Sequence, residues 1–233
     1  METTKIKFGK SEFTLHLRDE ADISVMREIF KLREYRIAEE AIKSAADPIF
    51  DIGAHAGFFS IYCRALNHQV EIVALEPEPD NVKIFKQHLK DNKIAGVKVI
   101  SGALAGQTGD RWLRISIDSH NHALTDSPTV SESASIKVHA FSLRDFCKNE
   151  KVKKISLLKM DIEGGEYEVL ENLTPSDYRL FKYAILEYHD SQRRNFRVLE
   201  KLLRENGFGV QIFPSKFDKN MGFIFASNKR GVV

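Results

Sequence analysis

The chain has 233 residues, which is enough for one ordinary domain with a full hydrophobic core. Apolar residues make up 42% and charged residues 29%, which excludes a disordered or fibrous chain. The 35 basic and 33 acidic residues leave a net charge of +2, so the basic excess typical of a nucleic-acid-binding protein is missing.

The only two cysteines, Cys63 and Cys147, are far apart in the sequence and fall within predicted helices. This excludes a disulfide framework or a Cys-x-x-Cys metal site and indicates two buried structural thiols. No apolar run approaches the roughly 18 residues of a membrane span, and residues 1–5 are polar, unlike a signal sequence. We therefore expect a cytoplasmic protein with neither a membrane nor a nucleic acid as partner.

The first 46 residues are expected to form an appendage. Apolar and polar side chains alternate over residues 5–17, a pattern that predicts a β-hairpin. Asp22 is placed to cap a following helix, and a second helix is expected over residues 36–45. We assign residues 1–46 to this appendage and residues 47–233 to the main domain.

Beyond Pro48, short apolar strands alternate with amphipathic helices. The strands are predicted at residues 49–52, 70–75, 97–100, 155–160 and 183–186, and helices at residues 79–92 and 193–206. Continuous apolar strands joined by helices are typical of a parallel sheet covered on both faces. A closing antiparallel hairpin over residues 208–213 and 221–226 completes a seven-stranded, mostly parallel α/β sheet.

A polar segment, residues 118–135, interrupts this alternation between two further predicted strands. It holds His120 and His122, which alone are only half of a metal site. A long polar segment inside a compact domain is typical of a lid over a binding site.

The first strand of the main domain runs into the sequence Asp51-Ile52-Gly53-Ala54-His55-Ala56-Gly57-Phe58. Glycines permit a sharp strand-to-helix turn and a close approach of the backbone to a ligand. The spacing Asp-x-Gly-x-x-x-Gly differs from that of dinucleotide sites, and Asp51 would repel a pyrophosphate but suits a cationic ligand. Glu76 ends the second strand, where an acid can bind the two hydroxyls of a ribose. A plain tight turn with a solvated glutamate is the alternative.

Two further strand ends carry titratable groups, Asp161 and Glu163 on one and Glu187 and His189 on the other. If both stretches are extended, each pair points to one side of the ligand-binding edge of the sheet. Such groups can take a proton from a reacting hydroxyl, with His189 as the first choice of base and Glu163 as the second.

Three alternatives stay open for these four residues. His189 can be a plain surface histidine, and Glu163 can tighten the turn that follows it. Asp161, Glu163 and Glu187 can also offer oxygen ligands to Mg²⁺.

Residues 157–166 read Leu-Leu-Lys-Met-Asp-Ile-Glu-Gly-Gly-Glu, and residues 184–189 read Ala-Ile-Leu-Glu-Tyr-His. The first stretch resembles the Lys-x-Asp-x-Glu-Gly-x-Glu signature of the FkbM family of methyltransferases, with every fixed position present. The second resembles that family's next strand, and the similarity spans about residues 20–227. The resemblance implies a Rossmann-like class I methyltransferase fold and S-adenosylmethionine as cofactor.

The resemblance also implies roles for individual residues. The methionine end of the cofactor would lie against the glycine turn, the ribose against Glu76 and the adenine near Ala103. Asp161, which ends the central strand, is expected beside the cofactor because of that position. The turn residues concerned are Asp51, Gly53, Ala54, His55, Gly57 and Phe58, and His55 departs from the Asn that is more common in the superfamily. The implied acceptor is a hydroxyl on a sugar, a glycan or a natural-product small molecule.

Three rival functions have different sequence requirements. An NAD-linked oxidoreductase is disfavoured by the glycine spacing and by Asp51. An RNA methyltransferase is disfavoured by the near-neutral charge. A non-catalytic nucleoside-binding module would leave the acids and the histidine at the strand ends without a use.

Overall fold

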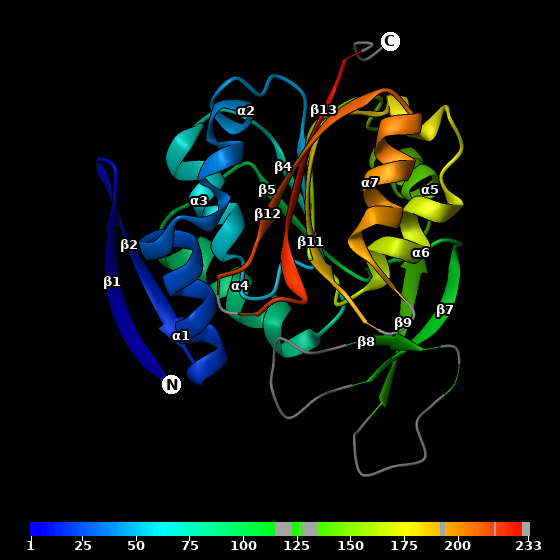
Figure 1. Ribbon diagram of the computed structural model, residues 1–233. Coiled ribbons are helices and arrows are strands. Elements are labelled where there is room, and N and C mark those ends of the chain that lie inside the picture. Colours follow the sequence, from blue (N-terminus) through cyan, green and yellow to red (C-terminus); the bar gives the residue numbers. More distant parts are fainter. Residues whose placement is uncertain (115–122, 126, 128–134, 192–193, 217, 230–233) are drawn as a thin grey trace.

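The computed structural model describes residues 1–114, 123–125, 127, 135–191, 194–216 and 218–229 (Figure 1). The predicted lid over residues 118–135, with His120 and His122, lies mostly outside the described residues. Its described part includes a short strand, β8, at Ala123–Thr125.

A seven-stranded sheet forms the centre of the molecule, in the order β12-β13-β11-β10-β3-β4-β5 (Figure 1). Neighbours from β5 to β11 pair in parallel, and β13 pairs antiparallel with both β11 and β12. This confirms the predicted mostly parallel sheet with a C-terminal antiparallel hairpin. The strands span Ile49–Ile52 (β3), Ile72–Glu76 (β4), Val97–Ser101 (β5), Ile155–Met160 (β10), Phe181–His189 (β11), Phe208–Pro214 (β12) and Met221–Asn228 (β13).

Helices cover both faces of this sheet, with α3 and α4 on one side and α5, α6 and α7 on the other (Figure 1). Every residue of β3, β4 and β10 is buried, as expected for strands covered on both faces. None of the described helices is long and apolar enough to cross a membrane. The helices span Phe58–Leu66 (α3), Pro79–Asp91 (α4), Leu143–Glu150 (α5), Gly165–Asn172 (α6) and Phe196–Glu205 (α7), with a 3₁₀ turn at Asp177–Arg179.

A second, four-stranded sheet adjoins the first and has the order β6-β9-β7-β8. The sequence predicts strands in this region but not their assembly into a separate sheet. Its strands span Ala103–Leu104 (β6), Gly109–Arg114 (β7), Ala123–Thr125 (β8) and Ser135–Phe141 (β9). Because β6 follows β5 directly, this sheet lies next to the carboxyl edge of the main one.

The N-terminal hairpin is confirmed, but the helices after it differ from prediction. The single helix expected over residues 36–45 is split into a 3₁₀ helix and a short α-helix. Arg33, with a left-handed backbone at φ 54°, separates them from the preceding π-helix. The elements span Glu2–Phe8 (β1), Ser11–Leu17 (β2), Glu20–Arg27 (α1), Glu28–Leu32 (π-helix η1), Glu34–Ala38 (3₁₀ helix η2) and Glu39–Lys43 (α2).

The prediction that Asp22 caps the first helix is wrong. Asp19 is the cap, and its carboxylate accepts a hydrogen bond from the backbone N–H of Asp22 at 3.0 Å. Asp22 is fully buried and is held instead by Arg18. Both aspartates satisfy the capping rule in sequence, so spacing alone does not distinguish them.

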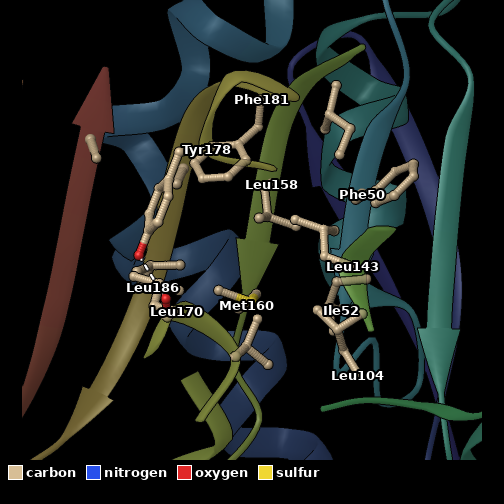
Figure 2. Packing of buried hydrophobic residues seen from close by; sticks show 14 of the residues in the cluster. Phe50, Ile52, Leu104, Leu143, Leu158, Met160, Leu170, Tyr178, Phe181 and Leu186 are labelled. Atoms are coloured by element: carbon tan, nitrogen blue, oxygen red, sulfur yellow. Dashed lines mark hydrogen bonds between the residues drawn. The ribbon is translucent and has the colours of Figure 1, made fainter. Parts of the chain in front are cut away.

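One large apolar cluster combines residues of the main sheet with residues of helices α5, α6 and α7, and Figure 2 shows part of it. Phe50, Leu158 and Leu186 contribute to it from three neighbouring strands. The buried hydroxyl of Tyr178 donates a hydrogen bond to the carbonyl of Leu170 at 2.7 Å, so this polar group is satisfied within the core (Figure 2). The two predicted buried thiols, Cys63 and Cys147, are confirmed.

A second apolar cluster joins the N-terminal elements to the other face of the sheet. Leu15 and Ile42, both with 0% exposure, belong to the same cluster as Ile49 of β3 and Ile185 of β11. The assignment of residues 1–46 and 47–233 to separate units stays a prediction that unfolding experiments can test.

Replacing Leu15 with alanine is expected to lower the free energy of unfolding by about 2–5 kcal/mol, because it opens a cavity in this cluster. Chemical denaturation should show one cooperative transition, moved to lower urea concentration. The half-exposed Val198 is the matched control, and its alanine variant should change stability by no more than about 0.5 kcal/mol. An early transition confined to the hairpin would show instead that residues 1–46 unfold separately.

Candidate active site

The glycine turn after β3 follows a left-handed path at three positions. Gly53, His55 and Gly57 have φ angles of 72°, 51° and 83°. Histidine, like asparagine, is among the side chains most often found there, so the loop accepts His55 where Asn is more common. The turn is fixed to β4 because the N–H groups of Gly53 and Ala54 both donate to the carbonyl of Leu75, at 3.0 and 3.2 Å.

Gly53 allows the ends of β3 and β10 to meet. A Cβ atom at Gly53 would lie 1.9 Å from the carbonyl oxygen of Asp161, and one at Gly57 would lie 2.0 Å from the ring of Phe85. Neither contact is sterically allowed, so both positions require glycine for space as well as for φ. The first glycine therefore brings Asp161 next to the turn.

The side chain of Lys159 bridges the ends of β3 and β10. Its ammonium donates to the carbonyls of Gly53, at 2.7 Å, and Ile52, at 3.3 Å. It also lies 3.5 Å from Asp51 and 3.7 Å from Asp161. Burial alone would lower the pKa of Lys159, but these two carboxylates outweigh it and raise that pKa, so the lysine stays charged. Sequence analysis assigned Lys159 no role, because it lies inside an apolar strand.

Asp51 stabilises the turn from a buried position outside the cavity. Its carboxylate is fully buried and accepts a hydrogen bond from the hydroxyl of Ser60 at 2.6 Å. Neither Asp51 nor Gly57 lines the cavity described below. The structure therefore gives both residues a place in the frame of the turn, without direct access to that cavity.

Glu76, at the end of β4, is surrounded by hydrogen-bond donors. One carboxylate oxygen accepts from the N–H of His55 at 2.8 Å, and the other accepts from the N–H of Glu78 at 3.0 Å and the amide of Asn81 at 3.1 Å. Burial raises the pKa of Glu76, and these hydrogen bonds partly counter the rise. The carboxylate is thereby fixed in one orientation at the cavity wall.

One cavity at the carboxyl edge of the sheet brings most of the predicted site residues together. Its wall includes the predicted residues Gly53, Ala54, His55, Phe58, Glu76, Ala103, Asp161, Glu163 and Glu187. His189 does not line it. The N-terminal elements add Val25, Glu28, Ile29 and Tyr35, although no motif in the sequence of that segment singles these residues out.

Glu163 and His189 face each other at 3.6 Å between a carboxylate oxygen and Nε2. The assumption of an extended chain is wrong for residues 161–163, because β10 ends at Met160 and Glu163 has a left-handed φ of 55°. It is correct for Glu187 and His189, which both belong to β11. The turn at Glu163 places its carboxylate in the cavity wall, in front of His189.

Burial and charge set the protonation of this pair. Burial, followed by the nearby Asp161 and Glu166, raises the pKa of Glu163 to about 8. Burial lowers the pKa of His189, and the Nδ1 atom of its ring has no hydrogen-bond partner among the described residues. At neutral pH the pair therefore holds one proton on Glu163 beside a neutral imidazole, so it is not an ion pair.

The turn after β10 is tightened by Glu166, the role that the sequence left open for Glu163. The Glu166 carboxylate is fully buried and accepts a hydrogen bond from the N–H of Ile162 at 2.6 Å. Burial raises the pKa of Glu166 to about 7, although backbone hydrogen bonds oppose this. Glu163 is thus free of that structural task.

Glu187 and Tyr35 complete the deeper wall of the cavity. Burial raises the pKa of Glu187 well above its usual value, and Asp161 and Glu163 raise it further. Burial, followed by Asp161 and Glu187, raises the pKa of the Tyr35 phenol. In the part of the chain that the structure describes, no three His, Cys, Asp or Glu side chains are arranged to hold a metal ion.

The fold is shared with solved structures. The chain superposes on FkbM from Methylobacillus flagellatus with a TM-score of 0.54 at 12% identity, covering 90% of this chain and 55% of that one. Fibrillarin of Methanococcus jannaschii gives a TM-score of 0.54 at 12% identity, with 98% and 83% covered. At these identities the likeness shows the fold alone, and it is the class I methyltransferase fold.

The family follows from the sequence. The model of the methyltransferase FkbM domain matches residues 51–210, and the chain belongs to this family of S-adenosylmethionine-dependent methyltransferases. The hexuronic acid methyltransferase AglP of Haloferax volcanii is 23% identical over 87% of this chain and 82% of its own length. The 31-O-demethyl-FK506 methyltransferase of Streptomyces tacrolimicus is 25% identical over 79% and 80%.

The raised pKa of Glu163 predicts how stability depends on pH. Because the folded state favours the protonated acid, this contribution to stability is complete below the unfolded value of about 4.5 and is lost as the pH rises through about 8. Glu163→Gln mimics the protonated side chain. It should match the wild type near pH 5 and be more stable above pH 8, measured as urea midpoints.

The exposed Glu171 provides the control, and Glu171→Gln should follow the wild type at every pH. Equal pH dependence in the wild type and in Glu163→Gln would contradict the buried, protonated state of Glu163.

Proposed function

We propose that this protein transfers the methyl group of S-adenosylmethionine to a hydroxyl oxygen of a sugar, a glycan or a natural-product small molecule. The observation that carries the proposal is a single cavity whose wall joins Glu76 to the acids Asp161, Glu163 and Glu187. The names of two relatives, a hexuronic acid methyltransferase and a 31-O-demethyl-FK506 methyltransferase, support an acceptor of this kind.

The residues of the cavity fit the cofactor. Glu76 is fixed by three donors and has lone pairs left to accept hydrogen bonds from the ribose hydroxyls. The backbone of Gly53, Ala54 and His55 forms the wall for the methionine end, and Ala103 lies on the adenine side. Asp51 and Gly57 would act indirectly, by shaping the turn. The cofactor, when bound, supplies the electrophilic methyl group.

The remaining wall suits a hydroxylated acceptor. Tyr35, Phe59 and Phe223 form an aromatic group, with the ring of Tyr35 4.8 Å from that of Phe59 and 5.1 Å from that of Phe223. Glu28 and Glu187 line the same cavity and can hydrogen-bond hydroxyl groups. Aromatic faces with nearby carboxylates match the apolar faces and hydroxyl edges of a sugar ring.

Methyl transfer requires the acceptor oxygen to be held in line with the methyl carbon and to lose a proton. Sequence analysis favoured His189 as the base. The geometry supports a different division of work, in which Glu163 faces the cavity and takes the proton, and His189 behind it holds Glu163 in position. Glu163 also raises the pKa of Glu187, so the titration of Glu163 depends on that neighbouring acid.

Replacing Glu76 with alanine should weaken binding of S-adenosylhomocysteine by about ten- to a hundred-fold, because a carboxylate hydrogen bond contributes roughly 1.5–3 kcal/mol. Calorimetric titration measures this directly. The control is Asp80→Asn, at an exposed acid four residues after Glu76, and it should leave the affinity unchanged. Wild-type affinity in Glu76→Ala would remove Glu76 from the cofactor site.

Turnover should rise with pH through an apparent pKa of about 8, because only the ionised form of Glu163 accepts a proton. Glu163→Gln should lower kcat by about 10²–10⁴-fold and remove this dependence, while S-adenosylhomocysteine affinity stays within about threefold. A panel of sugars and hydroxylated natural products supplies the acceptor, and NMR of the product identifies the methylated oxygen.

His189→Ala tests the other half of the pair. It should lower kcat far more than cofactor affinity and move the apparent pKa of turnover, as expected for a positioning residue. A rate within about threefold of wild type and an unmoved pH profile would exclude His189 from the mechanism. The same assay with and without EDTA tests the Mg²⁺ alternative at Asp161, Glu163 and Glu187.

A further inference from the structure

Arg18 connects the N-terminal hairpin to the cofactor side of the cavity. It follows β2 and forms a two-pronged pair with the fully buried Asp22, from Nε at 2.9 Å and from Nη2 at 2.8 Å. The backbone N–H of Arg18 donates to the same carboxylate at 2.7 Å. Three hydrogen bonds thus fix the guanidinium plane, and such a paired geometry is specific to arginine.

The fixed guanidinium then determines the orientation of Asn81. Nη2 of Arg18 donates to the side-chain oxygen of Asn81 at 2.7 Å. Because arginine has only donors, the oxygen of this amide must face Arg18 and its NH₂ group must face the other way. That NH₂ group donates to Glu76 at 3.1 Å. Asn81 is almost fully buried, with 2% exposure, so water cannot readily take over either contact.

Arg18 and Asp22 also touch the ring of His55. Nε2 of this ring lies 3.3 Å from Nη2 of Arg18 and 3.4 Å from a carboxylate oxygen of Asp22. Burial lowers the pKa of His55 to about 4, so the ring is neutral at neutral pH. The two hydrogens of Nη2 are directed to Asp22 and Asn81, so the approach of Arg18 to His55 is a close contact and not a third full hydrogen bond. The backbone N–H of His55 is another of the donors to Glu76.

We propose that Arg18 is a positioning residue for the cofactor: through its hydrogen bond to Asn81 it orients one of the three groups that fix Glu76 for the ribose hydroxyls, and it also contacts the ring of His55. The inference rests on the proposed role of Glu76. Arg18 lies outside residues 51–210, the part matched by the family model. The N-terminal segment thereby becomes part of the cofactor site as well as of the cavity wall.

The chemistry of the amide gives the expected effect of losing Arg18. Without that donor, the Asn81 oxygen loses its partner and the amide is held at one end only, so its hydrogen bond to Glu76 is less well fixed. Glu76 is then held less firmly in the orientation that binds the ribose. Loss of a hydrogen bond to a charged group corresponds to about tenfold in affinity.

The test compares S-adenosylhomocysteine with its analogue lacking the ribose 2′-hydroxyl, by calorimetry on the full chain. The wild type should prefer the first by about tenfold or more. Arg18→Met should weaken binding of S-adenosylhomocysteine by about tenfold and reduce the preference between the two probes. Arg36→Met, at an exposed arginine of the same segment, should change neither value.

Asn81→Asp is the second variant. It keeps a partner for Arg18, and so favours folding, but it places an oxygen against Glu76 where the amide donated. It should also weaken binding and reduce the preference between the probes. Asn81→Asp can be measured even if Arg18→Met fails to fold, because it leaves the pair of Arg18 and Asp22 intact.

These measurements distinguish the positioning role of Arg18 from the role of Glu76 in binding the ribose. Wild-type affinity and preference in folded Arg18→Met, or in Asn81→Asp, would overturn the positioning role. If Glu76→Ala itself binds both probes like the wild type, the assignment of Glu76 to the ribose fails first. Weakened binding of both probes with an unchanged preference would mean that Arg18 stabilises the fold only, and this too would overturn the proposal.

Discussion

The close approach of β3 and β10 is the constraint on which the site depends. A buried ammonium at Lys159 is satisfied only if the carbonyls of Ile52 and Gly53 turn toward it and Asp51 and Asp161 stand on either side. A buried charge without such partners would be costly, so these contacts fix the two strand ends together. The absence of a Cβ at Gly53 makes the approach sterically feasible. The cavity opens at the junction that results.

Burial favours the protonated forms of two acids in the cavity wall. The pKa values of Glu163 and Glu187 are both raised, chiefly by burial and then by neighbouring carboxylates. A cationic ligand would favour the ionised forms of these acids and so couple its binding to proton release. The one carboxylate of the cavity bound by several backbone and amide donors, Glu76, lies toward the other end, where the proposal places a neutral ribose. The two ends of the cavity therefore differ in how their acids are held.

Much of this arrangement could be predicted from the sequence. The apolar strands and amphipathic helices have clear periods, and the glycine turn and Glu76 stand at strand ends, where parallel strands meet at one edge. Lys159 is a fixed position of the signature, but its role could not be predicted, because its charge is compensated by groups 106 to 108 residues away in the chain, as its contacts with Asp51, Ile52 and Gly53 show. The role of Arg18 could not be predicted for the same reason, since its partner Asn81 is 63 residues away.

Other errors have local causes. Side-chain alternation holds along β11 but stops where β10 ends, so it gave Glu163 the wrong backbone conformation, although Glu163 does line the cavity. The cap of the first helix was assigned to Asp22 because spacing cannot show that this carboxylate is already bound by Arg18. The π-helix at Glu28–Leu32 has no sequence signal of its own, yet it brings Glu28 and Ile29 to the cavity.

A crystal structure of the protein with bound S-adenosylhomocysteine would show whether this cavity holds the cofactor. We expect the ribose hydroxyls to lie within hydrogen-bonding distance of the Glu76 carboxylate and the thioether sulfur to point toward Asp161 and Glu163. The acceptor space should then lie between Glu163, Glu187 and Tyr35. A ribose bound away from Glu76, or a sulfur facing away from the acids at the end of β10, would contradict this expectation.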